Sequence, residues 1–260
     1  MSESALSADY VIIGAGIAGA SAAYWLAPYG RVIVLERETQ PGYHSTGRSA
    51  AQFMESYGSL QVRRLTRASR AFFMQPPAGF APHALMHPRG SLFVATIGQE
   101  DLLREQWELL RQTSPNLQRL DAAHACALFP VLQPDKVCGA LLDPDTCDMD
   151  VDALLQGFLR GVRQAGGQIV TQAEVKQMRR EKDGLWHVQS ADRTFIAPVV
   201  VNAAGAWADE IARLAGAEPL GLEPRRRSAF TFPVSEGMDT AAWPMAIGIA
   251  ENWYIKPDAG

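Results

Sequence analysis

The N-terminal part of the chain places short apolar runs on either side of a glycine-rich turn. Residues 10–13 form a β-branched and aromatic run, which predicts a buried strand. Residues 17–26 are rich in alanine and predict a helix, and residues 31–35 predict a second buried strand. Strands without polar alternation are typical of a parallel sheet whose faces are covered by helices. Residues 9–36 therefore predict a β–α–β unit.

Later segments show helical periodicity. Residues 60–73 carry apolar side chains at helical spacing, and the arginines between them are expected to form a solvated face. Asp150 is a good N-cap for a helix that ends near the pair Gly166 and Gly167. The predicted helices after the first one are residues 60–73, 101–112, 121–128, 150–165 and 206–214.

Apolar runs of strand length are frequent in the second half of the chain. Turn residues at 182–184 and 191–192 predict hairpins between consecutive strands. Residues 257–260 have the composition of a hairpin turn with no strand after it, so we expect that the C-terminal part of the fold is missing. The predicted later strands are residues 91–96, 168–170, 173–178, 185–189, 194–196, 199–201, 227–232 and 246–256.

Composition narrows the class of protein. Of the 260 residues, 47% are hydrophobic and 20% are charged, with a formal net charge of -4, as in ordinary soluble globular proteins. No basic block stands out beyond residues 225–227, which argues against a nucleic-acid partner. Because the three cysteines (Cys126, Cys138 and Cys147) are widely spaced, no disulfide framework is expected, and the reducing cytoplasm is the predicted location.

Local sequence argues against three further features. The first nine residues contain no basic residue, unlike a signal peptide. The apolar stretch at residues 11–27 is slightly short for a membrane span and contains glycines, so no transmembrane segment is expected. His83 and His87 are four residues apart, but prolines bracket them, so no metal site is expected.

The turn after the first strand has the spacing Gly14-x-Gly16-x-x-Gly19. In such a turn the first glycine permits the tight bend, the second lets the backbone approach a pyrophosphate, and the third lets helix and strand pack closely. Free N–H groups at the helix N-terminus favour phosphate. Glu36 ends the second strand, where its carboxylate can accept hydrogen bonds from ribose hydroxyls and would repel a 2′-phosphate. The pattern predicts a dinucleotide site that disfavours NADP; the alternative is a glycine-rich packing turn.

The motif alone does not separate FAD from NAD, but the following segments do. An NAD domain usually continues as β–α repeats, whereas here residues 44–51 form a polar loop and a long insertion follows. The chain later returns with a strand and the segment 202–207. These segments resemble the D-amino acid oxidase superfamily of flavoproteins, which includes glycine and sarcosine oxidases. Residues 41–51, 226–230 and 254–260 together resemble, more narrowly, the bacterial D-arginine dehydrogenases.

The resemblance implies an α/β fold with an α+β insert and FAD as the cofactor. The FAD-binding domain, a Rossmann-like parallel sheet, would comprise residues 1–51 and 145–218. The substrate domain, a discontinuous antiparallel sheet, would comprise residues 52–144 and 219–260. For Arg48 a surface charge is the open alternative. The implied cofactor-binding residues are Gly14, Gly16, Ile17, Ala18, Gly19, Glu36, Arg37, Ser45, Thr46, Arg48, Ser49, Ala50, Ala51, Val175, Ala203, Ala204 and Gly205.

The resemblance also implies a substrate pocket. Arg227 would anchor a substrate carboxylate bidentately, Tyr254 would donate its hydroxyl to the same group, and Tyr57 would line the pocket. For both tyrosines packing in the core is the alternative. Two positions depart from the D-arginine dehydrogenase pattern: Ser91 stands in place of a glutamate, and Gln52 in place of a histidine near the flavin. Without the glutamate a buried guanidinium has no partner, so a neutral or apolar D-amino acid is expected instead of D-arginine.

The implied activity is oxidation of the amine of a D-amino acid by hydride transfer from Cα to flavin N5. The imino acid then hydrolyses to a keto acid and ammonia. Three alternatives remain: a glycine or sarcosine oxidase-like activity, a 2-hydroxy acid dehydrogenase, and an inactive FAD-binding fragment. The sequence leaves the electron acceptor open.

Overall fold

The computed structural model describes residues 5–191 and 193–257, so most of the predicted turn at 257–260 lies outside the described residues. The chain divides into two compact units. Unit 1 comprises residues 1–50, 77–83 and 150–227, and unit 2 comprises residues 51–76, 84–149 and 228–260. These units differ from the predicted domains in two ways. The segment 77–83 belongs to unit 1, and the chain passes from unit 2 to unit 1 between residues 149 and 150 and back to unit 2 between residues 227 and 228. Each unit is described by itself below.

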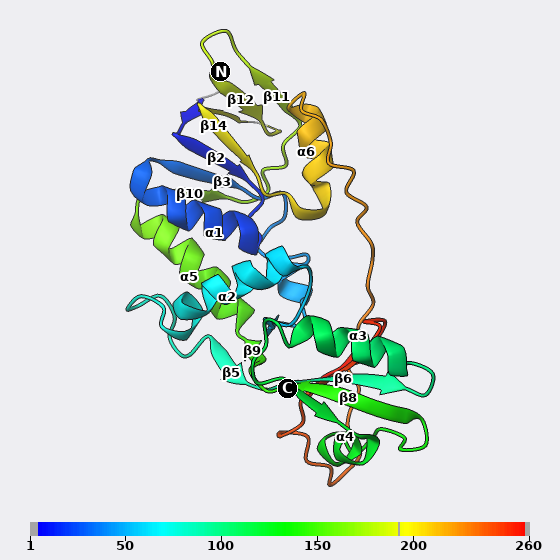
Figure 1. The fold of residues 1–260 in the computed structure, drawn as a ribbon. Coiled ribbons are helices and arrows are strands. Elements are labelled where there is room, and N and C mark those ends of the chain that lie inside the picture. Colours follow the sequence, from blue (N-terminus) through cyan, green and yellow to red (C-terminus); the bar gives the residue numbers. More distant parts are fainter. Residues whose placement is uncertain (1–4, 192, 258–260) are drawn as a thin grey trace. The chain divides into compact units, whose positions relative to one another are not determined.

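Unit 1 is built on a four-stranded parallel sheet in the order β10-β3-β2-β14. Its β2, α1 and β3 confirm the predicted β–α–β unit. On one face Ile12, Val32 and Val34 pack with α1 and with Val162 of α5, and Figure 1 shows α1 and α5 side by side. The elements are β2 (Tyr10–Ile13), α1 (Ile17–Leu26), β3 (Val32–Leu35), α5 (Val151–Gln164), β10 (Gln168–Val170) and β14 (Val199–Asn202).

A second sheet and a short helix complete unit 1. The sheet has the order β1-β13-β12-β11, with antiparallel hairpins from β11 to β13. The predicted strand at 173–178 is wrong over residues 173–176, since β11 begins only at Gln177. Ala173 N donates instead to Glu36 O at 2.8 Å. The elements are β1 (Leu6–Ser7), β11 (Gln177–Arg180), β12 (Trp186–Gln189), β13 (Thr194–Ala197) and α6 (Ala208–Leu214).

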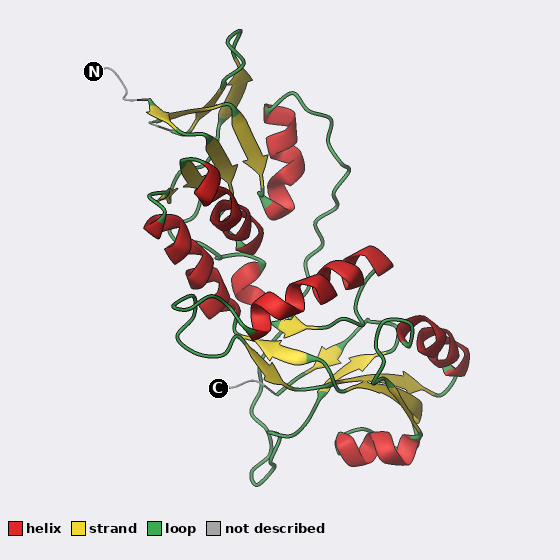
Figure 2. Cartoon of the chain, turned by 60° about the vertical axis from the view of Figure 1, so that its left-hand side comes forward, coloured by secondary structure: helices red, strands yellow, loops and turns green. Residues whose placement is uncertain are grey.

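Unit 2 contains a five-stranded sheet in the order β16-β15-β6-β8-β7 and a three-stranded sheet in the order β4-β9-β5. Leu92, Val94 and Ala246 pack on one face of the larger sheet with Ala125 of α4. Figure 2 shows the strands in yellow and the helices in red. The elements are β4 (Gln52–Phe53), α2 (Leu60–Met74), β5 (Met86–Pro88), β6 (Ser91–Thr96), α3 (Glu100–Leu110), β7 (Gln118–Leu120), α4 (Ala122–Leu128), β8 (Val137–Asp143), β9 (Cys147–Met149), β15 (Met245–Gly248) and β16 (Tyr254–Ile255).

Two sequence predictions in the last part of the chain are corrected. Residues 217–235 contain no helix or strand, so the predicted strand at 227–232 is wrong. Its apolar side chains Phe230 and Phe232 are exposed, and no strand among the described residues pairs with this segment. The predicted strand at 246–256 is instead two short antiparallel strands, β15 and β16, joined by a turn.

The buried and exposed side chains of α2 differ from those expected of an amphipathic helix with a solvated arginine face. Arg63, predicted to be solvated, is only 4% exposed, and its Nη1 donates to Leu109 O at 3.3 Å and to Thr113 Oγ1 at 3.4 Å. Leu65, at 69% exposure, faces solvent within unit 2. A guanidinium is buried where acceptors on the neighbouring segment receive its protons, a condition that helical spacing alone does not reveal.

The N-terminus of α5 provides a test of the fold of unit 1. The Asp150 side chain accepts a hydrogen bond from Ala153 N at 2.8 Å and pairs with His83 Nε2 at 2.7 Å. We expect Asp150→Ala to lower the free energy of unfolding by about 1 kcal/mol, because a capping acceptor is lost. Urea unfolding measures this value. Asp150→Asn, which retains a capping oxygen, should cost less, and an equal loss in both variants would contradict the capping role.

The same carboxylate predicts a pH dependence. Hydrogen bonding from Ala153 N, and then from His83, lowers the pKa of Asp150. Because the folded pKa lies below the unfolded one, this stabilisation is present above the unfolded pKa of about 3.9. It is lost as the pH falls through the folded value. The stability difference between wild type and Asp150→Ala should therefore shrink on acidification below that range.

Candidate functional site

The glycine motif forms the turn between β2 and α1. Gly14 has a φ of +104°, and a Cβ there would lie 2.4 Å from Ala203 O. A Cβ on Gly19 would lie 1.8 Å from Gly14 O. A Cβ on Gly16 would instead meet only Thr46 Oγ1, at 3.2 Å. The first and third glycines are thus required by backbone packing, whereas at the second an added Cβ would meet only a side-chain hydroxyl, and no backbone atom.

Glu36 stabilises the glycine turn through hydrogen bonds to the backbone, and it also lines a cavity beside the turn. Its Oε2 accepts a hydrogen bond from Ala15 N at 2.9 Å, and its Oε1 accepts one from Glu38 N at 3.0 Å. The side chain is buried, with 7% exposure. A carboxylate has about four acceptor positions, so two bonds to the backbone leave capacity for ribose hydroxyls. The sequence predicted only the ribose contact, and the bracing of the turn is an additional role.

The loop after β3 closes over the N-terminus of α1. Thr46 Oγ1 accepts a hydrogen bond from Ile17 N at 3.0 Å, which satisfies one of the free donors of the helix. Arg48 lies over the ring of Tyr43, with its Cζ 5.0 Å from the ring centroid. Ser49 and Ala50 end this part of unit 1, and Ala51, with a φ of 55°, begins unit 2.

A cluster of charged and aromatic side chains lines another part of the same cavity. The Arg37 guanidinium lies 4.5 Å from the ring centroid of Trp207, and the His44 ring lies 4.6 Å from it. His44 Nε2 is 2.9 Å from Glu38 Oε1, and Arg37 Nε is 3.1 Å from the same oxygen. The sequence prediction included Arg37 but missed Trp207 and His44. Their positions beside the predicted segments 203–205 and 45–51 were the available signal.

These elements enclose one cavity of about 160 Å³ within unit 1. Its wall includes ten predicted cofactor residues: Gly14, Gly16, Glu36, Arg37, Ser45, Thr46, Val175, Ala203, Ala204 and Gly205. Ile17, Ala18, Gly19, Arg48, Ser49, Ala50 and Ala51 are not part of this wall. Residues of the wall that the sequence did not predict include Tyr43, His44, Glu174, Trp207 and Glu210.

The geometry fits the pyrophosphate and a ribose of a dinucleotide such as FAD. The space at Gly16, where only a threonine hydroxyl lies near, suits close approach of a pyrophosphate to the helix N-terminus. The Glu36 carboxylate lines the same cavity and suits a ribose. Residues Gly14, Gly16 and Glu36 would hold the pyrophosphate and ribose, and the small residues Ala203 and Ala204 leave room for close contact.

Residues 9–260 match the family described as "DAO: FAD dependent oxidoreductase". The chain belongs to this family. FAD is therefore the cofactor, in agreement with the prediction from the sequence.

Similar proteins include several dehydrogenases. Human mitochondrial dimethylglycine dehydrogenase is 25% identical over 236 residues, which cover 88% of this chain and 27% of the relative. L-2-hydroxyglutarate dehydrogenase of Escherichia coli (strain K12) is 26% identical over 223 residues, which cover 81% of this chain and 50% of the relative. The chain thus spans about a quarter to a half of the length of these two relatives. These matches support the superfamily and not specifically the D-arginine dehydrogenases.

Solved structures share the fold. Glycine oxidase from Geobacillus kaustophilus superposes with a TM-score of 0.73 at 23% identity, covering 81% of this chain and 59% of that chain. L-proline dehydrogenase from P. horikoshii superposes with a TM-score of 0.75 at 18% identity, covering 99% of this chain and 73% of that chain. The predicted mixed α/β fold class is confirmed.

The predicted substrate residues are distributed over both units. Arg227 ends unit 1 in the exposed segment without helix or strand. Tyr57 and Tyr254 belong to unit 2 and are 44% and 39% exposed. Ser91 is fully buried, and its Oγ donates to Thr146 Oγ1 at 2.7 Å. Gln52 Nε2 donates to Asp148 Oδ1 at 3.4 Å. Their roles in substrate binding stay predictions.

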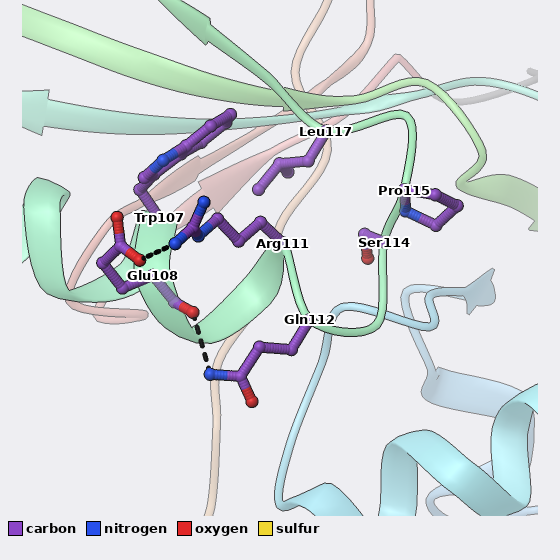
Figure 3. Close-up of a pocket in the computed structure, with 7 residues that line it drawn as sticks. All are labelled: Trp107, Glu108, Arg111, Gln112, Ser114, Pro115 and Leu117. Atoms are coloured by element: carbon purple, nitrogen blue, oxygen red, sulfur yellow. Dashed lines mark hydrogen bonds and ion pairs between the residues drawn. The ribbon is translucent and has the colours of Figure 1, made fainter.

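A larger hollow of about 470 Å³ lies on unit 2, where α3 ends (Figure 3). In it Arg111 pairs with Glu108, and Gln112 Nε2 donates to Glu108 O at 3.0 Å. None of the predicted site residues lines it. Within residues 5–191 and 193–257, no cluster of three or more His, Cys, Asp or Glu suits a metal ion. Nor is any helix in those ranges both long and apolar enough to span a membrane.

Proposed function

We propose that the protein oxidises the amine of a D-amino acid with FAD, releasing a 2-keto acid and ammonia after hydrolysis of the imino acid. The observation that carries this proposal is the cavity of unit 1, where the glycine turn and Glu36 are brought together. Membership of the FAD dependent oxidoreductase family supports it. When bound, FAD supplies the acceptor for the hydride of the substrate Cα.

The residues of this chain would then bind and orient the substrate. Arg227 would hold the carboxylate through paired N–H donors, and the Tyr254 hydroxyl would donate to the same group. Tyr57 would contribute to the pocket wall. Ser91 carries no charge, so nothing at that position favours a cationic side chain, and a neutral D-amino acid is the preferred substrate. Fixed positioning of this kind can provide most of the protein's contribution to the rate.

Two related activities are the competing proposals. Dimethylglycine dehydrogenase and glycine oxidase among the similar proteins favour an N-methylated or unsubstituted glycine as substrate. L-2-hydroxyglutarate dehydrogenase favours a 2-hydroxy acid. Cytoplasmic location and a small-molecule substrate without a nucleic-acid partner remain part of the proposal, and the electron acceptor is left unassigned.

The test is the visible absorbance of the full-length purified protein, before and after anaerobic addition of single substrates. A flavin spectrum that bleaches with D-amino acids is expected. Bleaching only with glycine, sarcosine and dimethylglycine, or only with 2-hydroxy acids, would support the corresponding alternative. A protein that stays colourless after incubation with FAD would contradict the proposal.

A substitution tests the predicted carboxylate anchor. Arg227→Met should raise the KM for a D-amino acid about tenfold, because a paired charge-assisted contact is lost. The flavin spectrum should be unchanged. Arg225→Met is the matched control, since Arg225 pairs with Glu223 at 3.0 Å on the exposed surface. Equal effects of the two substitutions would show that Arg227 is only part of a solvated basic run.

A further inference from the structure

Asp148 lies at the centre of a partly buried polar cluster in unit 2. Its Oδ2 accepts from Arg89 Nε at 2.7 Å, and its Oδ1 lies 3.2 Å from Lys256 Nζ. The side chains of Asp148, Arg89 and Lys256 are 20%, 15% and 18% exposed. Burial raises the pKa of Asp148, but Arg89 and Lys256 outweigh it, so the net pKa is lowered and the carboxylate stays ionised.

Sheet register places Gln52 beside this carboxylate. In the antiparallel pair of β4 and β9, Gln52 and Asp148 are directly opposite, so their side chains lie on the same face. Gln52 Nε2 donates to Asp148 Oδ1 at 3.4 Å. With the amide reversed, its oxygen would face the carboxylate and be repelled. The ionised Asp148 therefore fixes which end of the Gln52 amide points away from it.

The oxygen of the Gln52 amide lacks a hydrogen-bond donor. Gln52 Oε1 is buried and has no hydrogen-bond partner among the described residues. A buried acceptor without a donor destabilises the fold, so such atoms usually meet a ligand or a water. The position calls for a donor, an N–H or O–H, and not for another acceptor.

Asp148 also holds two other segments of unit 2. Arg89 donates through Nη1 to Ala241 O at 3.0 Å and to Trp243 O at 3.1 Å, just before β15. Lys256 follows β16, the strand that carries Tyr254. Ile255 packs into the core on the α4 side of the sheet. Because side chains alternate along a strand, Tyr254 and Lys256 share the opposite face. Asp148 thus joins the segments of two predicted pocket residues, Gln52 and Tyr254.

We propose that Asp148 is a positioning residue that orients Gln52, whose amide oxygen accepts an N–H of the substrate amine. The inference rests on the proposed function and narrows its substrate class. The reacting amine is neutral, and a neutral tertiary amine has no N–H to donate. Primary and secondary amines are therefore substrates, and tertiary amines are poor ones.

The test compares D-alanine, N-methyl-D-alanine and N,N-dimethyl-D-alanine with the full-length FAD-loaded protein. The second methylation, which removes the last N–H, should lower kcat/KM about tenfold or more relative to the monomethyl compound. In Gln52→Met, which keeps the size of the side chain but has no amide oxygen, this ratio should fall below threefold. Asp148→Asn should also reduce the ratio, because its amide can donate to Gln52 Oε1 and occupy it. Asp145→Asn, three residues away and paired with Asn116, should leave the ratio unchanged.

A ratio that persists in Gln52→Met would show that tertiary amines are excluded by their bulk and would overturn the inference, while the proposed function would stand. A wild-type protein that uses dimethylated and monomethylated substrates equally would do the same. If no amine reduces the flavin in any variant, the proposed function fails and this inference falls with it. Thermal unfolding and the FAD spectrum of each variant separate these outcomes from loss of the fold.

Discussion

Gly19→Ala should abolish FAD binding and destabilise unit 1 by roughly 3 kcal/mol or more, at the upper end of the cost of overpacking. The added Cβ would lie 1.8 Å from the carbonyl oxygen of Gly14 and 3.3 Å from the Ala203 side chain. The first of these is backbone in the turn that begins the cofactor cavity, so no rotamer change relieves the clash. Either α1 moves away from β2 or the turn loses its shape. Chemical unfolding and FAD titration of the apoprotein measure the two effects.

Two other glycines serve as controls for this substitution. Gly16→Ala meets only a threonine hydroxyl, at 3.2 Å, so it should weaken FAD binding while leaving the stability of the apoprotein within about 1 kcal/mol of wild type. Gly166→Ala adds a Cβ with nothing within 4 Å but at a φ of +82°, so it reports the conformational cost alone. If Gly19→Ala were no more destabilising than Gly166→Ala, the close contact of α1 with the turn would be disproved.

Glu36→Ala should lower the affinity for FAD about 100-fold, equivalent to about 2.7 kcal/mol. It removes the acceptor for the ribose and both hydrogen bonds to Ala15 N and Glu38 N. Hydrogen bonds to a charged group contribute about 1.5–3 kcal/mol each, so the apoprotein should also be less stable. Glu36→Gln retains one oxygen and should lie between wild type and Glu36→Ala. Fluorescence titration with FAD and urea unfolding give the two values.

Glu174→Ala is the matched control for Glu36→Ala. Glu174 lines the same cavity but pairs with Lys176 at the surface, where its side chain is 49% exposed. Its loss should change the affinity for FAD less than threefold. Equal losses in the two variants would indicate that general negative charge in the cavity, and not the braced position of Glu36, determines binding.

Much of unit 1 could be predicted from local sequence. The β2–α1–β3 unit and α5 were predicted because their apolar pattern, caps and glycines act within a few residues of one another. The fold of unit 2 was less accessible. β8 was not predicted from the sequence, because Gly139 interrupts its apolar run. In the structure β8 pairs with β6 along its length, including Val94 and Ala95. A Cβ added to Gly139 would lie 3.0 Å from Leu120 O and 3.0 Å from the Leu103 side chain, so this close packing favours glycine.

The strand predicted at 227–232 is the opposite kind of error, a strand predicted where the structure has none. Its alternating apolar side chains have the period of a strand, but a strand forms only where a neighbour supplies hydrogen bonds to its backbone. None of the described segments does so. Arg63 is a similar case, because its burial depends on acceptors from the segment 109–113 and not on its own helix.

The sequence by itself determined the glycine turn and the position of Glu36, because both lie in one continuous β–α–β unit. It also indicated the family, through several motifs spread along the chain. Only the tertiary structure decided that Trp207 and His44 share the wall of the cofactor cavity, and that Gln52 is held by Asp148 across 96 residues. Contacts of that kind arise from the register of strands and the packing of loops, and no short pattern in the chain encodes them.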